Sequence, residues 1–142
     1  NQFVAGFIGS PRMNLLNAEV LKTEANKAWL KLSGGEEFCL QTDRPVVVGD
    51  VLLLGIRPEH LVPVDHPDAG GRLSGLVQVA EHLGAESFVY MEVDGKDFTV
   101  KAASEIPVDT GDTLEVGVPA QACYLFDSKE QAFPRTTKYN RS

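Results

Sequence analysis

The residue types that carry most enzymatic chemistry occur in this sequence, but they do not form a recognisable catalytic pattern. The histidines, His60, His66 and His82, are widely separated and lack the spacing of a metal site. Cys39 and Cys123 fit neither a disulfide framework nor a zinc motif. We therefore expect no catalytic residue and no metal site. Surface or hydrogen-bonded histidines and two buried thiols explain these residues more simply.

One segment, Leu32-Ser33-Gly34-Gly35-Glu36, resembles the signature with which ABC ATPases contact a nucleotide. That signature directs backbone N–H groups and a helix N-terminus at the terminal phosphate. Here the following residues alternate like a strand, and Glu36 and Glu37 would repel a phosphate. No glycine-rich loop ending in Gly-Lys-Ser or Gly-Lys-Thr is present either. We interpret the segment as a hairpin turn and expect no nucleotide cofactor in this chain.

The composition indicates one acidic globular domain, or two small lobes that share a core. The chain has 142 residues, of which 43% are hydrophobic, and a formal net charge of −7. An acidic surface repels phosphate backbones, which disfavours nucleic acid as a partner. The longest apolar runs are too short to span a bilayer. No secretory signal is recognisable, and because the sequence opens at Asn1 in an apolar run, we interpret it as part of a longer chain.

Short alternating segments predict an all-β fold. Asp94-Gly95 lies between two of them and predicts a tight hairpin whose central residues have positive φ. Val51–Ile56 is continuously apolar, which is typical of a strand buried on both faces. Many short strands at this spacing indicate a barrel or sandwich. The other predicted strands cover residues 26–32, 38–40, 76–83, 88–93, 98–102, 113–118 and 125–126.

Helical periodicity is limited to single turns. These are predicted at Phe3–Ile8, Pro58–Leu61 and Pro119–Ala122, the last two with proline at the first position. Pro63–Gly71 is rich in Pro, Asp and Gly and is predicted to be a surface loop. The polar segment from about residue 129 is expected to be poorly ordered.

Four segments, taken in chain order, resemble a single protein family. They span residues 1–127, nearly the whole chain, and the last departs from the family pattern because Tyr124 stands where a histidine is usual. The segments are NQFVAGFIGSPRMN at 1–14, GIRPEHL at 55–61, GLVQVAEHLGAE at 75–86 and CYLFD at 123–127. Together they resemble the C-terminal regulatory domains of maltose-type carbohydrate-importer ABC ATPases.

This resemblance implies a TOBE-type, all-β fold made of OB-like barrels of short antiparallel strands, with only one-turn helices. Residues 1–12 would be the junction from a missing nucleotide-binding domain, and residues 13–142 would be the regulatory domain. The resemblance implies a regulatory and dimerisation role without chemistry of its own. ATP and Mg²⁺ would belong to the parent chain, an ABC transporter ATPase, and not to this fragment.

The resemblance also implies partners and a location. The domain would form a homodimer in the parent transporter and would contact the ATPase domain of its own chain. Through that domain it would be linked to the membrane subunits, in the cytoplasm, on the inner face of the cell membrane. In some members of the family the domain also receives inhibitory or signalling proteins.

Four residues are candidates for these contacts. Arg57 and Glu59 flank Pro58, and in an extended segment they would project to one side. They could form an exposed ion pair of little energetic value, or they could pair with a partner subunit at the dimer interface. Phe7 and Ile8 lie at the cut end and are candidates to contact the ATPase domain. Asn14 could cap the adjacent chain.

Two other function classes can be weighed against this role. A sensor of small ligands is the main alternative, because oxyanion-importer relatives bind their anion on similar barrels. An anion pocket needs basic residues or convergent N–H groups, yet Lys and Arg are outnumbered by Asp and Glu, 13 to 20. An OB-type nucleic-acid binder needs exposed aromatic residues beside a basic groove, and only 8% of the residues are aromatic.

Overall fold

The computed structural model describes residues 12–32 and 34–127. The predicted turn at Phe3–Ile8, with Phe7 and Ile8, and the polar segment from residue 129 lie outside the described residues. The predicted all-β fold with one-turn helices is confirmed. The elements are β1 Asn14–Glu24, β2 Lys27–Leu32, β3 Glu37–Gln41, β4 Val51–Ile56, η1 Pro58–His60, β5 Ala69–Leu83, β6 Glu86–Val93, β7 Lys96–Ala102, β8 Thr113–Pro119, η2 Ala120–Ala122 and β9 Tyr124–Phe126.

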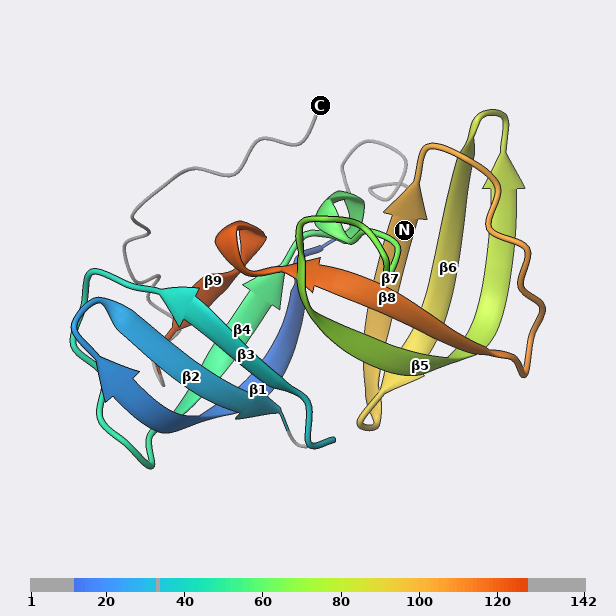
Figure 1. Cartoon of the computed structure of the whole chain (residues 1–142). Helices are drawn as coiled ribbons and strands as arrows, with labels where there is room; N and C mark the ends of the chain where they lie inside the picture. The colour runs from blue at the N-terminus through green and yellow to red at the C-terminus, as the bar shows by residue number, and fades with distance from the viewer. Residues whose placement is uncertain (1–11, 33, 128–142) are drawn as a thin grey trace.

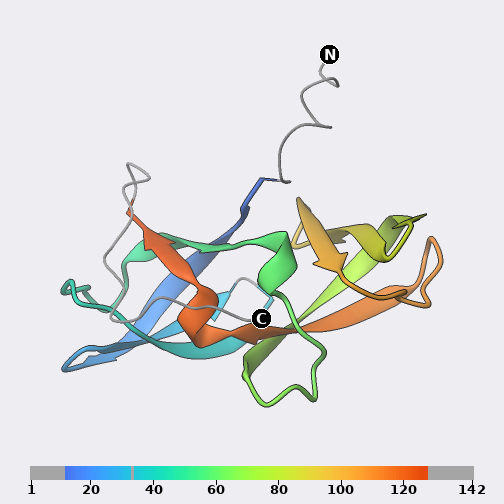
Figure 2. The same cartoon turned by 90° about the horizontal axis from the view of Figure 1, so that it is seen from above.

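The strands form two curled antiparallel sheets that lie side by side (Figures 1 and 2). Sheet A has the strand order β3-β2-β1-β4-β9, and sheet B has the order β7-β6-β5-β8. After β8, the chain passes through η2 and returns to sheet A as β9. Buried hydrophobic residues from both sheets make up one continuous core, so neither sheet is an independent unit.

Alternation of apolar and polar residues decides which face of each strand enters the core. In β2, Ala28, Leu30 and Leu32 are buried, whereas Trp29 and Lys31 face outward, as the sequence predicts. The prediction for Val51–Ile56 is only partly right. Its last three residues are buried on both faces, but Val51 is 62% exposed because it lies at the outer end of β4.

Two features of the sheets were not expected from the sequence. The sequence analysis missed β1, although residues 14–20 alternate between buried and outward positions, and a register shift between Val20 and Lys22 ends this alternation. The strand β5 begins at Ala69, inside the predicted loop, because its glycines pair with the end of β8. A side chain at Gly71 would overlap the ring of Phe38, so glycine is needed there for β5 and β3 to approach each other.

Both predicted turns are confirmed. Asp94 and Gly95 have φ values of 53° and 77° and join β6 to β7. The segment that resembles an ATPase signature connects β2 to β3. There the Leu32 N–H donates to the Glu36 carbonyl at 2.8 Å, and the Gly35 N–H donates to the Leu32 carbonyl at 2.9 Å. No helix begins at the described residues of this segment, Leu32 and 34–36.

The side chain of Asn14 joins the two sheets. Its Nδ2 donates to the Thr99 carbonyl at 2.9 Å, and its Oδ1 accepts from the Thr99 N–H at 2.8 Å. Thr99 lies on β7, an edge strand of sheet B, and Asn14 is only 5% exposed. Contrary to our expectation, the residue therefore does not cap the adjacent chain. Its side chain instead provides hydrogen-bond partners for the backbone of a sheet edge 85 residues away.

We expect Asn14→Ala to lower the free energy of unfolding by about 2 kcal/mol, because both backbone groups of Thr99 lose a buried partner. Asn17→Ala on the same strand is the matched control, since Asn17 is exposed. Urea denaturation monitored by tryptophan fluorescence measures both variants. Equal midpoints for the two variants would show that this contact contributes nothing.

We expect Gly95→Ala to cost about 1 kcal/mol of stability, because a side chain disfavours the positive φ at this turn. Gly70→Ala is the control: Gly70 lies in β5 without a positive φ, and an added Cβ there would make only ordinary contacts. Thermal unfolding compares the two. A melting temperature for Gly95→Ala as high as that of the control would contradict the assigned turn.

Candidate interaction surface

Arg57 and Glu59 lie at the corner where β4 ends and η1 begins. Both side chains are half-buried, and Pro58 between them is buried. The guanidinium carbon of Arg57 lies 5.9 Å from the centre of the Tyr124 ring, at a distance suited to a cation–π contact. Tyr124 is the residue that departs from the family pattern, so it supplies Arg57 with an aromatic neighbour within the chain. A role of this corner in a subunit interface stays a prediction.

A second surface, which sequence analysis missed, is the outer face of sheet B. We define it by five outward residues: Leu76, Val79, Leu83, Phe88 and Tyr90. On β5, the side chain of Leu76 is 48% exposed, that of Val79 is 47% exposed and that of Leu83 is 59% exposed. The rings of Phe88 and Tyr90 on β6 stack beside them, with their centres 6.5 Å apart. Exposed apolar groups that adjoin in this way indicate an interaction site more than single exposed residues do.

A β-bulge exposes the middle of this face. Val77 is 1% exposed, and in a regular strand Val79 would point into the core beside it. The register of β5 against β6 shifts between these two residues, so that Val79 pairs with Tyr90 and lies 47% exposed. The sequence alone shows alternating apolar residues here and gives no sign of the bulge. That is why the surface could not be predicted.

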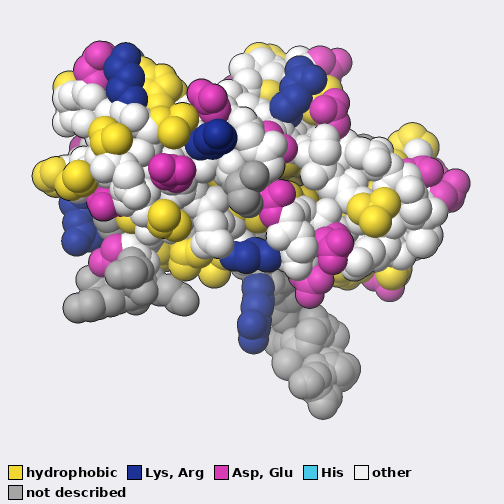
Figure 3. Space-filling model, turned by 90° about the horizontal axis from the view of Figure 1, so that it is seen from below, with side chains coloured by type: hydrophobic (Ala, Val, Ile, Leu, Met, Phe, Trp, Pro, Cys, Tyr) yellow, Lys and Arg dark blue, Asp and Glu magenta, His cyan; other side chains and the backbone are white. Residues whose placement is uncertain are grey.

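Charges of both signs border the outer face of sheet B. Lys101 Nζ lies 3.4 Å from the Glu86 carboxylate and 5.9 Å from the centre of the Phe88 ring. At the β8 side, Arg72 lies 3.7 Å from Glu115. The space-filling view from below shows hydrophobic side chains interspersed with acidic and basic ones (Figure 3). An apolar centre with a rim of both charges has the composition of a protein interface.

Tyr90 is the most perturbed titratable residue of this face. Partial burial raises the pKa of its phenol, and the negative charge of Glu81, which accepts a hydrogen bond from the Tyr90 hydroxyl at 3.3 Å, raises it further. Because the folded-state pKa is raised, folding favours the neutral phenol. Stability should therefore fall as the pH rises above the ordinary tyrosine value.

We expect Glu81→Gln to lower the pKa of Tyr90, since the neighbouring charge disappears while a hydrogen-bond acceptor remains. Ultraviolet absorbance of tyrosinate during an alkaline titration measures the change, with Tyr90→Phe to assign the signal. Glu24→Gln, far away on β1, is the control. An unchanged titration curve in Glu81→Gln would show that the carboxylate does not act on this phenol.

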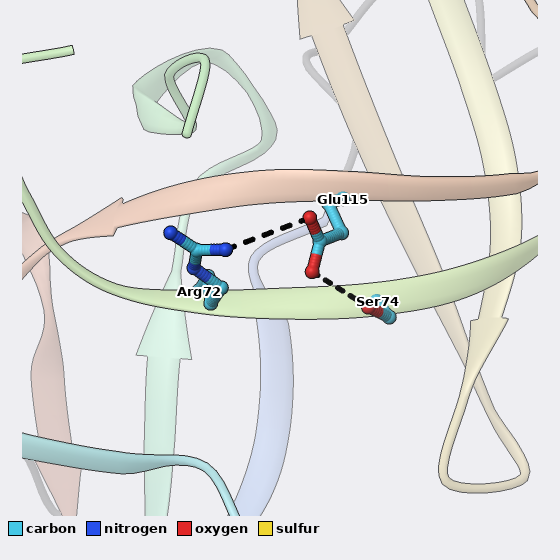
Figure 4. Close-up of polar contacts among 3 residues, drawn as sticks. All are labelled: Arg72, Ser74 and Glu115. Atoms are coloured by element: carbon cyan, nitrogen blue, oxygen red, sulfur yellow. Dashed lines mark hydrogen bonds and ion pairs between the residues drawn. The ribbon is translucent and has the colours of Figure 1, made fainter. Parts of the chain in front are cut away.

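Arg72, Ser74 and Glu115 form a polar cluster at the edge of this face (Figure 4). The Ser74 hydroxyl donates to one Glu115 oxygen at 3.5 Å, and Arg72 lies 3.7 Å from the other. Arg72 and Ser74 are the types of residue that could hold an oxyanion. Here they converge on a carboxylate of the protein itself, which also repels other anions. This geometry does not favour an anion site.

The remaining residues with possible chemistry are dispersed. Within residues 12–32 and 34–127, no group of three or more His, Cys, Asp or Glu side chains could hold a metal ion. The His66 ring accepts from the Asp68 N–H at 3.0 Å, and His82 contacts Ser87 at the same distance. Cys123 is buried, but Cys39 is exposed, contrary to our expectation, because it alternates with the buried residues of β3.

The same described part of the chain contains no helix that is long and apolar enough to cross a bilayer. The strands of this part define an all-β, OB-like domain. Two family models match the chain. The MalK OB fold domain matches residues 9–61 and the TOBE domain matches residues 54–126. The chain belongs to the TOBE domain family, in the form found next to a MalK-type OB fold, as its sequence motifs predicted.

Curated relatives resemble the chain over nearly all of its length. The maltose/maltodextrin import ATP-binding protein MalK of Vibrio cholerae is 43% identical over 141 residues, which are 97% of this chain and 37% of that protein. The protein of the same name from Vibrio parahaemolyticus is 42% identical over 143 residues, covering 99% of this chain and 38% of its own length. The chain thus spans little more than a third of these relatives.

Among solved structures, the cytoplasmic molybdate-binding protein ModG, with molybdate bound, has a similar fold. The TM-score is 0.64 at 15% sequence identity, and the match covers 83% of this chain and 96% of that one. At this level of identity the similarity concerns the fold and not the ligand.

Proposed function

We propose that this chain is the regulatory and dimerisation domain of the ATP-binding subunit of a carbohydrate ABC importer, without chemistry of its own. The similarity to maltose-import ATP-binding proteins over 97% of the chain carries this proposal. In the parent chain, ATP and Mg²⁺ bind to a nucleotide-binding domain that precedes these residues. Phe7 and Ile8 then contact that domain, which links the subunit to the membrane components at the cytoplasmic face.

The outer face of sheet B is our candidate for the self-association surface. A two-fold contact brings the same patch of both copies together, so a suitable patch must be complementary to itself. An apolar centre can meet another apolar centre, and the Lys101–Glu86 and Arg72–Glu115 pairs at the rim place both charges opposite a second copy. The apolar centre also offsets the mutual repulsion of two chains that each carry a net charge of −7. Arg57 and Glu59 remain candidates for the border of the contact.

Such a contact has a mechanical use in a transporter ATPase. Two nucleotide-binding domains must meet to hydrolyse ATP, and an appended domain that keeps its own pair together raises the effective concentration of one for the other. The ATPase domains can then open and close without dissociating. A surface that is free of catalytic groups and rests on a rigid sheet suits this role. It also leaves other surfaces available to regulatory proteins.

A small-ligand sensor remains the alternative class, but no contact in the described residues supports it. The fold is shared with a molybdate-binding protein at 15% identity. Arg72, beside the Ser74 hydroxyl, is the basic residue best placed to bind an anion, but it already forms an ion pair with Glu115. We therefore favour the interaction domain.

We expect Leu83→Asp to weaken self-association of the 142-residue chain at least tenfold, because two new charges would be buried in the apolar centre of the contact. Sedimentation equilibrium over a range of protein concentrations measures the dissociation constant. A chain that stays monomeric at the highest concentrations would contradict the proposal that this domain associates by itself.

Val48→Asp is the matched control, since Val48 is also 59% exposed but precedes β4 in sheet A. We expect it to leave the dissociation constant within a factor of about two. If Val48→Asp weakens association and Leu83→Asp does not, the interface lies on sheet A. Arg57→Glu tests the border residues in the same assay, and an unchanged constant would remove Arg57 from the interface.

A further inference from the structure

A groove lies where sheet B remains open between its two edge strands, β7 and β8. Its volume is about 560 Å³, which is in the usual range of binding sites. One wall is the segment 61–65, and the other consists of residues 100–107, from the end of β7 into the following loop. Residues 114–116 of β8 run along it. The lining is mainly apolar and includes the buried residues Leu61 and Val116.

The edge of β8 presents unpaired backbone groups to this groove. Gly117 exchanges two hydrogen bonds with Val62, of 2.6 Å and 3.1 Å, on the side away from β5. Backbone groups two residues apart in a strand point to the same side, so those of Glu115 and Thr113 also point away from β5. No described residue pairs with them, because the chain turns away after Val62 at Pro63. A strand pairing thus begins beside β8 and stops after one residue.

The charges at the groove are mainly negative. Asp65 and Glu105 are exposed on its two walls, whereas Glu115, along β8, is paired with Arg72 at 3.7 Å. The one basic residue of the lining, Lys101, is paired with Glu86 at 3.4 Å. The groove therefore favours a ligand that is cationic as well as apolar.

We propose that this groove binds an extended segment of a partner protein as an additional strand along β8. The segment pairs with the free backbone groups of Thr113 and Glu115, places apolar side chains at alternate positions against the groove, and carries Lys or Arg toward Asp65 and Glu105. Adding a strand to an exposed edge is a general mode of peptide recognition: backbone hydrogen bonds supply affinity and side-chain pockets supply specificity. The groove shares Lys101 and Glu115 with the rim of the outer face of sheet B, but the proposal does not require self-association through that face.

A blocked peptide of six residues that alternates valine and lysine serves as the probe. We expect it to shift the NMR signals of the Thr113 and Glu115 amides in the labelled 142-residue chain and to slow their hydrogen exchange. The same peptide with glutamate in place of lysine should bind at least tenfold more weakly. A version methylated on every backbone nitrogen should lose affinity to the same extent, because it cannot donate to β8.

Paired charge reversals test the electrostatic part of the proposal. Asp65→Lys with Glu105→Lys should weaken binding of the lysine peptide at least tenfold, whereas Glu37→Lys with Asp43→Lys should leave it within a factor of about two. All four residues are exposed, and the control pair lies in and beside β3, outside the groove lining. Signals from the rest of the chain verify that each variant is folded.

Three outcomes would overturn the proposal. The first is equal affinity for the lysine, glutamate and methylated peptides. The second is a set of shifted signals that does not include β8. The third is a shift of the same signals with protein concentration in Leu83→Asp, without peptide, which would mean that a second copy of the chain occupies the groove and not the outer face of sheet B.

Discussion

The two hydrogen bonds between Asn14 and the backbone of Thr99 hold the two sheets in their relative position. They satisfy both backbone groups of one residue at the edge of β7, within a core that has few other polar side chains among the described residues. The close approach of Gly71 and Phe38 maintains the same packing from the β5 side.

The interaction surfaces follow from this packing. Sheet B uses its inner face for the shared core, and no other described element covers its outer face. Its two edge strands, β7 and β8, do not pair with each other, and residues 61–65 and 100–107 line a groove beside them. The outer face of sheet B and the groove are both apolar with charged borders, and neither brings together groups that could perform a reaction.

Much of the fold could be predicted from local patterns. The alternation in β2, β3, β6, β7 and β8 identifies buried and exposed residues, and Asp94-Gly95 specifies its own turn conformation. Family motifs identified the class of domain. The prediction failed where glycines at the start of β5 resemble a loop, and it missed β1 although residues 14–20 alternate. Arg57 could be selected from its motif, but the sequence could not show that Tyr124 is its neighbour.

The sequence by itself determined the strands, their inward faces, the tight turns and the absence of a phosphate-binding loop. These depend on residues within a few positions of each other, whose spacing is fixed by the geometry of an extended chain. Only the tertiary structure decided that Val79 is exposed, that Asn14 reaches Thr99, and that β8 has an unpaired edge beside a groove. Each of these depends on the register between strands or on the contact between sheets. Register and contact are set by how the whole core packs, which no short stretch of sequence specifies.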